Sequence, residues 1–485
     1  MFTTYTLRLI GLLGLYFTNG SQAETTLIKN VTIINEYAEL LEQPKNILII
    51  DEIISKIGNF DTQADHIIDG QGKYLIPGLI DSHVHLKGVP GLRVDSVKDQ
   101  ELQRDGAKQI PRSYLYFGFT TVLDLASYSS FVSQWNAQVY APEALYCTAM
   151  SILNGYPIVY SGEAASQLSS PMASYLLYDK NQSDEYPADY PVKEHLPEHL
   201  VKKAKKEGAI CIKTFYEKGF GVKKNLPVPD LDLIRELKLY ASQENMPLFL
   251  HANSTDAYQF ASQTNVSVLA HGLWHSNGND IKPLIKDIAH QDISVQLTLT
   301  VVEGELDLFD HSFFSSEEAH SAIPSSLINW YKSESGQWFK KILSSNVLNL
   351  QNNKQHETMK KKYDHVFQTL RKGVHSLLEN NVNLVFGSDT PSGPIYTQFP
   401  GLNGFREIQA WARTGVDLKT LFKSLTIRNA ELLGVQNRIG AIREGMQADL
   451  LLLNENPLVD VQAYNSIQTV FIDGLAIDRE SLAAK

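Results

Sequence analysis

Two histidines stand one residue apart at the end of an apolar run, in the segment LIPGLIDSHVHL at residues 75–86. Side chains alternate between the two faces of a β-strand, so residues i and i+2 point the same way. The imidazoles of His83 and His85 are therefore expected to face one point. Because neutral imidazole is a frequent ligand of zinc, this spacing predicts a metal ion beside the end of a strand.

Four further side chains that can bind a metal lie at or near the ends of segments with the composition of strands. They are Lys213 in residues 209–215, His251 in 247–252, His271 in 266–271 and Asp389 in 382–389. Taken alone, Asp389 has an ordinary alternative role as the cap of the turn that follows it. Together, four imidazoles and a carboxylate predict one site for zinc or a similar first-row ion.

The elements that must position these residues lie in the middle of the chain, residues 76–430. Strand-like segments alternate there with amphipathic, helix-like segments such as 199–208, 230–245 and 363–381. The strand-like segments are 78–84, 119–125, 143–151, 209–215, 247–252, 266–271, 292–299 and 382–389. Eight such units predict an α/β fold with a (β/α)8 TIM-like barrel, whose active site lies at the C-terminal ends of the strands.

Both ends of the chain have a different sequence pattern, in which short segments of alternating apolar and polar residues are separated by polar turns. These segments are 26–35, 46–58 and 66–78 near the N-terminus, and 448–458 and 467–477 near the C-terminus. Alternation of this kind indicates half-buried strands. We expect residues 24–75 and 431–485 to form one small β-sandwich domain, with the barrel inserted between its two parts.

Residues 1–23 have the pattern of a secretory signal peptide. Arg8 precedes an apolar run at residues 9–17, and Ser21-Gln22-Ala23 fits a small-x-small cleavage site. The run is too short to span a bilayer, so no stable membrane anchor is expected after cleavage. The pattern predicts an exported protein, periplasmic or secreted. A short buried N-terminal helix is the alternative.

The composition is that of an ordinary globular protein, with 43% apolar residues among 485. A net charge of −11 argues against nucleic acid as a partner. Cys147 and Cys211 are the two cysteines, and both lie in apolar runs. Although an exported compartment would allow a disulfide, we expect two buried thiols that act as small hydrophobic side chains.

A long insertion of about residues 299–382 follows the seventh predicted strand, on the active-site side of the barrel. Long connections in compact domains are usually functional or disordered. Its aromatic residues predict a packed helical lid over a small-molecule substrate, and a contact in a homo-oligomer is the alternative. The basic run Lys360–Lys362 is expected on a solvated helix face. The aromatic residues are Phe313, Phe314, Trp330, Tyr331, Trp338 and Phe339.

Several motifs together resemble the amidohydrolase superfamily of metal-dependent hydrolases. They are PGLIDSHVHL, GFTTVLDL, GAICIKTF, LHA, LAHG, FGSDTP and the tail NAELLGVQNRIGAIREGMQADLLLLNENP. The resemblance implies a distorted (β/α)8 barrel flanked by a β-sandwich built from both chain ends. The IKTF strand and the export signal are most similar to enzymes related to Xaa-Pro dipeptidases and imidazolonepropionases.

The resemblance also implies a role for each candidate ligand. His83, His85 and Asp389 would bind one metal ion, and His251 and His271 would bind a second. Lys213 would bridge the two ions as N6-carboxylysine. A buried lysine near cations has a lowered pKa, so its neutral amine can capture carbon dioxide. The alternative is an ordinary Lys213 paired with an acid, which would leave a site with one ion.

Such a site implies hydrolysis by a metal-activated hydroxide, with Asp389 as the catalytic group that carries a proton from the water to the leaving group. The resemblance favours cleavage of a C–N bond in an amide, dipeptide or cyclic amide. Lactonase, esterase or phosphotriesterase-like hydrolysis is an alternative on the same metals, and a non-catalytic metal-binding barrel is another. Tyr216, Lys218 and Arg406 lie near strand ends and are candidate contacts for the substrate.

Overall fold

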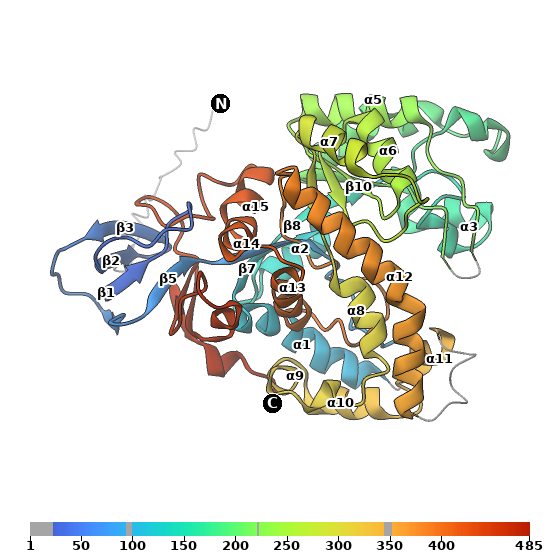
Figure 1. Ribbon diagram of the computed structural model, residues 1–485. Coiled ribbons are helices and arrows are strands. Elements are labelled where there is room, and N and C mark those ends of the chain that lie inside the picture. The colour runs from blue at the N-terminus through green and yellow to red at the C-terminus, as the bar shows by residue number, and fades with distance from the viewer. Residues whose placement is uncertain (1–22, 94–98, 221–222, 344–351) are drawn as a thin grey trace, which may run out of the picture.

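The computed structural model describes residues 23–93, 99–220, 223–343 and 352–485, which form two β-sheets and their covering helices (Figure 1). The predicted signal peptide therefore lies outside the described residues, apart from Ala23. Within the described ranges, no helix combines the length and the apolar composition needed to cross a membrane.

The central sheet has seven parallel strands in the order β12-β11-β10-β9-β8-β7-β6. They are β6 (Leu79–Val84), β7 (Phe119–Asp124), β8 (Glu143–Ala149), β9 (Cys211–Phe215), β10 (Leu248–His251), β11 (Val268–Ala270) and β12 (Ser294–Gln296). Each coincides with one of the first seven predicted segments. Most of their residues are buried, as expected for parallel strands that are covered on both sides.

The eighth predicted segment, 382–389, lies between the two edges of this sheet but forms only isolated bridges. Leu384 pairs with Val295 of β12, and Thr390, directly after the segment, pairs with Val84 of β6. Asp389 has a positive φ of 54°, which interrupts the extended backbone that a regular ladder requires. This segment connects β12 to β6 and carries Asp389 to the end of the first strand.

Helices follow most strands of the central sheet and cover it. They are α1 (Gln100–Tyr116), α2 (Ser129–Asn136), α4 (Pro197–Lys206), α5 (Leu231–Gln243), α6 (Thr255–Thr264), α7 (Lys282–His290), α13 (Leu402–Arg413), α14 (Leu418–Leu425) and α15 (Ile427–Leu432). The predicted helical segments 199–208 and 230–245 coincide with α4 and α5. Asp230 caps α5 by accepting a hydrogen bond from the backbone N–H of Asp232 at 3.0 Å.

The connection from β8 to β9 is made of short helices. They are η2 (Ile158–Ser161), α3 (Ala164–Leu168), η3 (Pro171–Tyr175), η4 (Lys180–Glu185) and η5 (Val192–His195). Leu153, Ile158, Leu176 and Tyr186 form a small core beneath them. This connection therefore has hydrophobic packing of its own.

The second sheet is built from both ends of the chain, seen on the left of Figure 1. Its strand order is β15-β14-β13-β5-β1-β2-β3, and β4 pairs with β1. The strands are β1 (Thr25–Ile33), β2 (Lys45–Ile50), β3 (Ile53–Gly58), β4 (His66–Asp69), β5 (Tyr74–Pro77), β13 (Leu450–Leu453), β14 (Ile467–Ile472) and β15 (Leu475–Asp478). A separate sheet from both ends was predicted.

β1 lies between β5 and β2 and joins the two halves of this second sheet. The eight strands therefore form one continuous sheet, whereas a sandwich would have two separate sheets. The N-terminal part of β1 pairs with β2 and β4, whereas Thr32 and Ile33 pair with β5. The register shifts between Ile28 and Val31, where Asn30 has a positive φ of 56°. This bulge lets one strand belong to both halves, and a shared hydrophobic cluster packs them together.

The insertion is helical, as predicted. It contains α8 (Thr300–Asp307), η6 (Phe313–Ser315), α9 (Glu317–Ala322), α10 (Ser325–Lys332), α11 (Trp338–Leu343) and α12 (Asn352–Glu379). The Tyr331 hydroxyl donates to the carbonyl of Pro90 at 2.6 Å, and the Trp338 indole N–H donates to that of Gly91 at 2.8 Å. The insertion therefore holds the loop that follows His85. Lys360–Lys362 are exposed, as expected.

The prediction of two free thiols is wrong, because Cys147 and Cys211 form a disulfide with Cα atoms 4.4 Å apart. These residues lie directly opposite each other on the neighbouring strands β8 and β9. Such a pairing depends on the register between two strands that are distant in sequence. Sequence patterns within each strand do not reveal that register.

Candidate metal centre

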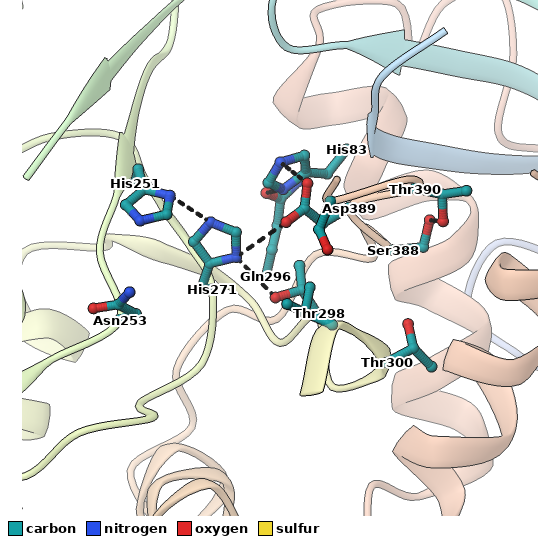
Figure 2. Close-up of polar contacts among 12 residues, drawn as sticks. His83, His251, Asn253, His271, Gln296, Thr298, Thr300, Ser388, Asp389 and Thr390 are labelled. Atoms are coloured by element: carbon teal, nitrogen blue, oxygen red, sulfur yellow. Dashed lines mark hydrogen bonds and ion pairs between the residues drawn. The ribbon is translucent and has the colours of Figure 1, made fainter. Parts of the chain in front are cut away.

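Three of the candidate ligands converge on one carboxylate oxygen. Nε2 of His83 and Nε2 of His85 each lie 3.1 Å from Oδ1 of Asp389. One ligand atom from each residue lies within 4.8 Å of the others, which is compact enough to surround a metal ion. Figure 2 shows His83 and Asp389 facing each other, brought together by β6 and the segment 384–390.

The other two histidines form a neighbouring pair. Nε2 of His271 lies 2.8 Å from Nδ1 of His251, and Nδ1 of His271 lies 3.8 Å from Oδ2 of Asp389 (Figure 2). Both rings are buried, and burial lowers the pKa of each, so both are neutral near pH 7. Two nitrogens of neutral imidazoles that face each other can share one metal ion.

Lys213 is buried on β9 and has an amine without a hydrogen-bond partner among the described residues. Burial lowers its pKa to about 7, a shift that the charge of Asp389 only partly opposes. The charge of Lys213 in turn acts on all four histidines of the centre. An isolated buried amine costs free energy, and conversion to an anionic carbamate beside metal ions would relieve this cost. The residues present thus fit the predicted bridging carboxylysine.

Three polar side chains orient the histidine rings from outside. Oε1 of Gln296 lies 3.1 Å from Nδ1 of His83, Oγ1 of Thr298 lies 2.9 Å from Nδ1 of His271, and Oε2 of Glu217 lies 3.2 Å from Nε2 of His251. For His83 and His251 the contacted nitrogen faces away from the other candidate ligands, whereas the contacted Nδ1 of His271 also lies 3.8 Å from Oδ2 of Asp389. Such partners fix ring orientation and leave the other nitrogen available to a metal.

Sequence reasoning did not single out these three outer partners, although the strand period could have found Glu217. Gln296 and Thr298 lie two residues apart at the end of the seventh strand. Glu217 lies four residues after Lys213, so it falls on the same face if the strand period continues. A search for polar residues at i+2 and i+4 from each candidate ligand would have included Glu217, whereas Gln296 and Thr298 lie in the seventh predicted strand, which carries no candidate ligand.

Asp389 is an anion held in a strained position. Burial raises its pKa, but the charge of His83 and the hydrogen bonds of His83 and His85 outweigh that effect and hold the pKa well below its usual value. Its φ of 54° is unusual for a residue with a side chain. The backbone N–H of Asp389 donates to the carbonyl of His83 at 2.7 Å, which secures this geometry.

Asp81 joins the two segments that carry the first three ligands. Its Oδ1 accepts hydrogen bonds from the backbone N–H groups of His83 at 3.2 Å and Ser388 at 3.0 Å. The Ser388 hydroxyl donates to Oδ2 at 2.5 Å. The spacing between His83 and Asp389 is therefore fixed by buried hydrogen bonds as well as by strand pairing.

Access to the centre differs among the histidines. The side chain of His85 is 35% exposed, whereas those of His83, His251 and His271 are at most 7% exposed. The ring of Tyr156 lies 5.0 Å from that of His251, and Trp274 lies 5.0 Å from His271. Solvent therefore reaches the centre at His85, while aromatic rings border the other pair.

The three candidate substrate contacts have partners outside this centre. The ring of Tyr216 packs against Phe260 at 4.8 Å, and Lys218 forms an exposed ion pair with Asp256 at 3.0 Å. Arg406 forms an ion pair with Asp307 of α8 at 2.5 Å. Their role in substrate binding stays a prediction.

Comparisons with known proteins agree with this architecture. The model of the Amidohydrolase family matches residues 74–477. A solved Xaa-Pro dipeptidase with bound methionine in its active site has a TM-score of 0.64 and 20% identity, covering 94% of this chain and 100% of that one. At this level of identity the likeness concerns the fold.

Two curated relatives match over shorter stretches. A dihydroorotase of Halalkalibacterium halodurans is 35% identical over 98 residues, which are 20% of each protein. An adenine deaminase of Thermosipho melanesiensis is 40% identical over 68 residues, 14% of this chain and 12% of that protein. The chain thus matches a fifth or less of the length of these relatives. Because the family match itself extends over most of the sequence, the protein belongs to the amidohydrolase family.

Proposed function

We propose that this protein is a metal-dependent hydrolase that cleaves a C–N bond in a small amide, dipeptide or cyclic amide. The observation that carries the proposal is the convergence of His83 and His85 on Asp389, beside the buried pair His251 and His271. The names of the similar adenine deaminase and Xaa-Pro dipeptidase refer to reactions at C–N bonds. In this proposal the seven strands and segment 383–390 together form the eightfold barrel of the family.

His83, His85 and Asp389 would hold one divalent ion, and His251 and His271 a second, with carboxylated Lys213 between them. Zinc suits these nitrogen and oxygen ligands. A bound divalent ion lowers the pKa of water and polarises a carbonyl oxygen. Lys213 can become a ligand because its pKa of about 7 keeps much of the amine neutral at physiological pH, and the neutral nitrogen forms a bond to the carbon of carbon dioxide with loss of a proton.

Asp389 would accept the proton of the attacking water and deliver it to the departing nitrogen. Its lowered pKa keeps it ionised and able to accept a proton. Amide nitrogen leaves poorly as an anion, so this protonation matters more for an amide than for an ester. The outer contacts of His83 with Gln296 and of His271 with Thr298 would keep both rings oriented during the reaction.

We also propose that the mature protein is exported. The apolar run and cleavage pattern of residues 1–23 support this proposal. The disulfide between Cys147 and Cys211 supports it independently, because structural disulfides form and persist mainly in oxidising compartments.

The experiment compares matched amide and ester substrates with purified, zinc-loaded protein. The proposal expects turnover of dipeptides or N-acyl amino acids that exceeds turnover of the corresponding esters after correction for the uncatalysed rates. A preference for esters, lactones or phosphotriesters would support the alternative hydrolase activities. Bound metal without turnover of any of these substrates would support a non-catalytic barrel.

A further inference from the structure

We propose that Glu217 is a positioning residue that presets His251 to bind the second metal ion and sets the affinity for that ion. This inference rests on the proposed function only for the identity of the ligands. It concerns a side chain outside the predicted ligand set, located two residues after the end of β9.

Glu217 is 7% exposed, and three donors hold its carboxylate. Oε2 lies 3.2 Å from Nε2 of His251 and accepts a hydrogen bond from Nδ2 of Asn253 at 2.8 Å. Oε1 accepts from the backbone N–H of Gly219 at 2.6 Å. These contacts fix the carboxylate of Glu217 next to His251.

A carboxylate oxygen can only accept a hydrogen bond, so this contact decides which nitrogen of His251 carries the proton. The proton must lie on Nε2, between His251 and Glu217. In a neutral ring, Nδ1 is then a free acceptor that faces Nε2 of His271 at 2.8 Å. Glu217 thereby selects the tautomer of His251 whose unprotonated nitrogen faces the second ion's position.

The outer partners of His83 and His271 lack this charge. Gln296 contacts His83 and Thr298 contacts His271, and both are neutral. A carboxylate that receives the N–H of a metal-bound imidazole raises the basicity of the ligand, and loss of such an outer partner typically weakens metal binding by about 10- to 100-fold. Removal of the charge of Glu217 should therefore act selectively on the ion held by His251 and His271.

The test measures zinc affinity for the first and second equivalents by competition with a chelating indicator in Glu217→Gln. We expect the second equivalent to bind about tenfold more weakly or worse, with the first unchanged and with an unaltered melting temperature of the metal-free protein. Glu217→Asp, which keeps the charge, should recover part of the affinity. Glu305→Gln is the matched control, because it changes a partly buried glutamate, which accepts a hydrogen bond from Tyr363.

Unchanged affinity for the second equivalent in Glu217→Gln would overturn the proposal. So would an equal loss for both ions, or a fall in metal-free melting temperature that accounts for the loss, since each indicates a general structural role. A wild-type protein that binds a single equivalent would also overturn it. These readouts do not depend on turnover, so they remain informative if the proposed C–N hydrolysis proves absent.

Discussion

Nε2 of His83 lies 3.1 Å from Oδ1 of Asp389, and the backbone N–H of Asp389 donates to the carbonyl of His83 at 2.7 Å. The first strand of the barrel region and its last segment therefore meet through both side chains and backbone. This double contact explains why the last segment is irregular. Its backbone turns at Asp389 to direct the carboxylate toward the histidines, at the expense of regular strand pairing.

Replacement of Asp389 by asparagine tests its role in proton transfer. We expect zinc-loaded Asp389→Asn to lose at least about a hundredfold in kcat on an amide substrate, because general acid–base groups contribute about 10²- to 10⁴-fold. The measurement is steady-state turnover, with bound zinc determined on the same sample. Asp232→Asn, on the exposed part of α5, serves as a control. Full activity of Asp389→Asn would remove this mechanism.

Carboxylation of Lys213 should depend on pH. The pKa of the amine is lowered from 10.5 to about 7, so the neutral form that reacts with carbon dioxide is scarce at pH 6 and dominant at pH 8. We expect zinc and bicarbonate together to restore activity to metal-free protein more completely at pH 8 than at pH 6. The measurement is recovered activity with and without bicarbonate. If recovery is independent of bicarbonate at both values, Lys213 acts as an ordinary lysine.

The disulfide should contribute to stability more than to chemistry. Cys147 and Cys211 are 64 residues apart in sequence, and a crosslink that closes a loop of this length stabilises a protein by about 4 kcal/mol in chain-entropy models. We expect the double Cys→Ser variant to melt at a lower temperature and to retain its zinc. Thiol alkylation of denatured, unreduced wild-type protein should label neither cysteine. Labelling of both would show that the thiols are free.

Glu407 anchors the start of the insertion. Its carboxylate accepts hydrogen bonds from the backbone N–H groups of Leu299 at 2.8 Å and Thr300 at 2.7 Å and from the indole of Trp411 at 2.8 Å. Glu407→Ala leaves these buried donors without an acceptor, which costs about 1–3 kcal/mol for each group. We expect a lower melting temperature and faster proteolysis within residues 299–343. Wild-type stability of this variant would contradict the assigned anchoring role.

The positions of the candidate ligands could be predicted because the signals are local. His83, His85, His251 and His271 follow apolar segments, and the ends of parallel strands meet at one edge of a sheet. The seven strands and the helical insertion follow from the same periodicity. None of these patterns requires knowledge of which strand lies beside which.

Features that depend on neighbouring segments could not be predicted in this way. The Cys147–Cys211 disulfide depends on the register of β8 against β9, and the ion pair of Arg406 depends on how α8 packs. The role of Glu217 depends on the orientation of the His251 ring. The ring of Tyr156 packs against that of His251 from the connection that follows β8, and no pattern in that connection predicts this contact.

The most direct test of the central claim is an anomalous-scattering map, recorded at the zinc edge from crystals of zinc-loaded protein. We predict one peak within about 2.0–2.2 Å of the facing atoms of His83, His85 and Asp389, and a second beside Nδ1 of His251 and Nε2 of His271. Peaks that contact no more than one of these side chains would contradict the account.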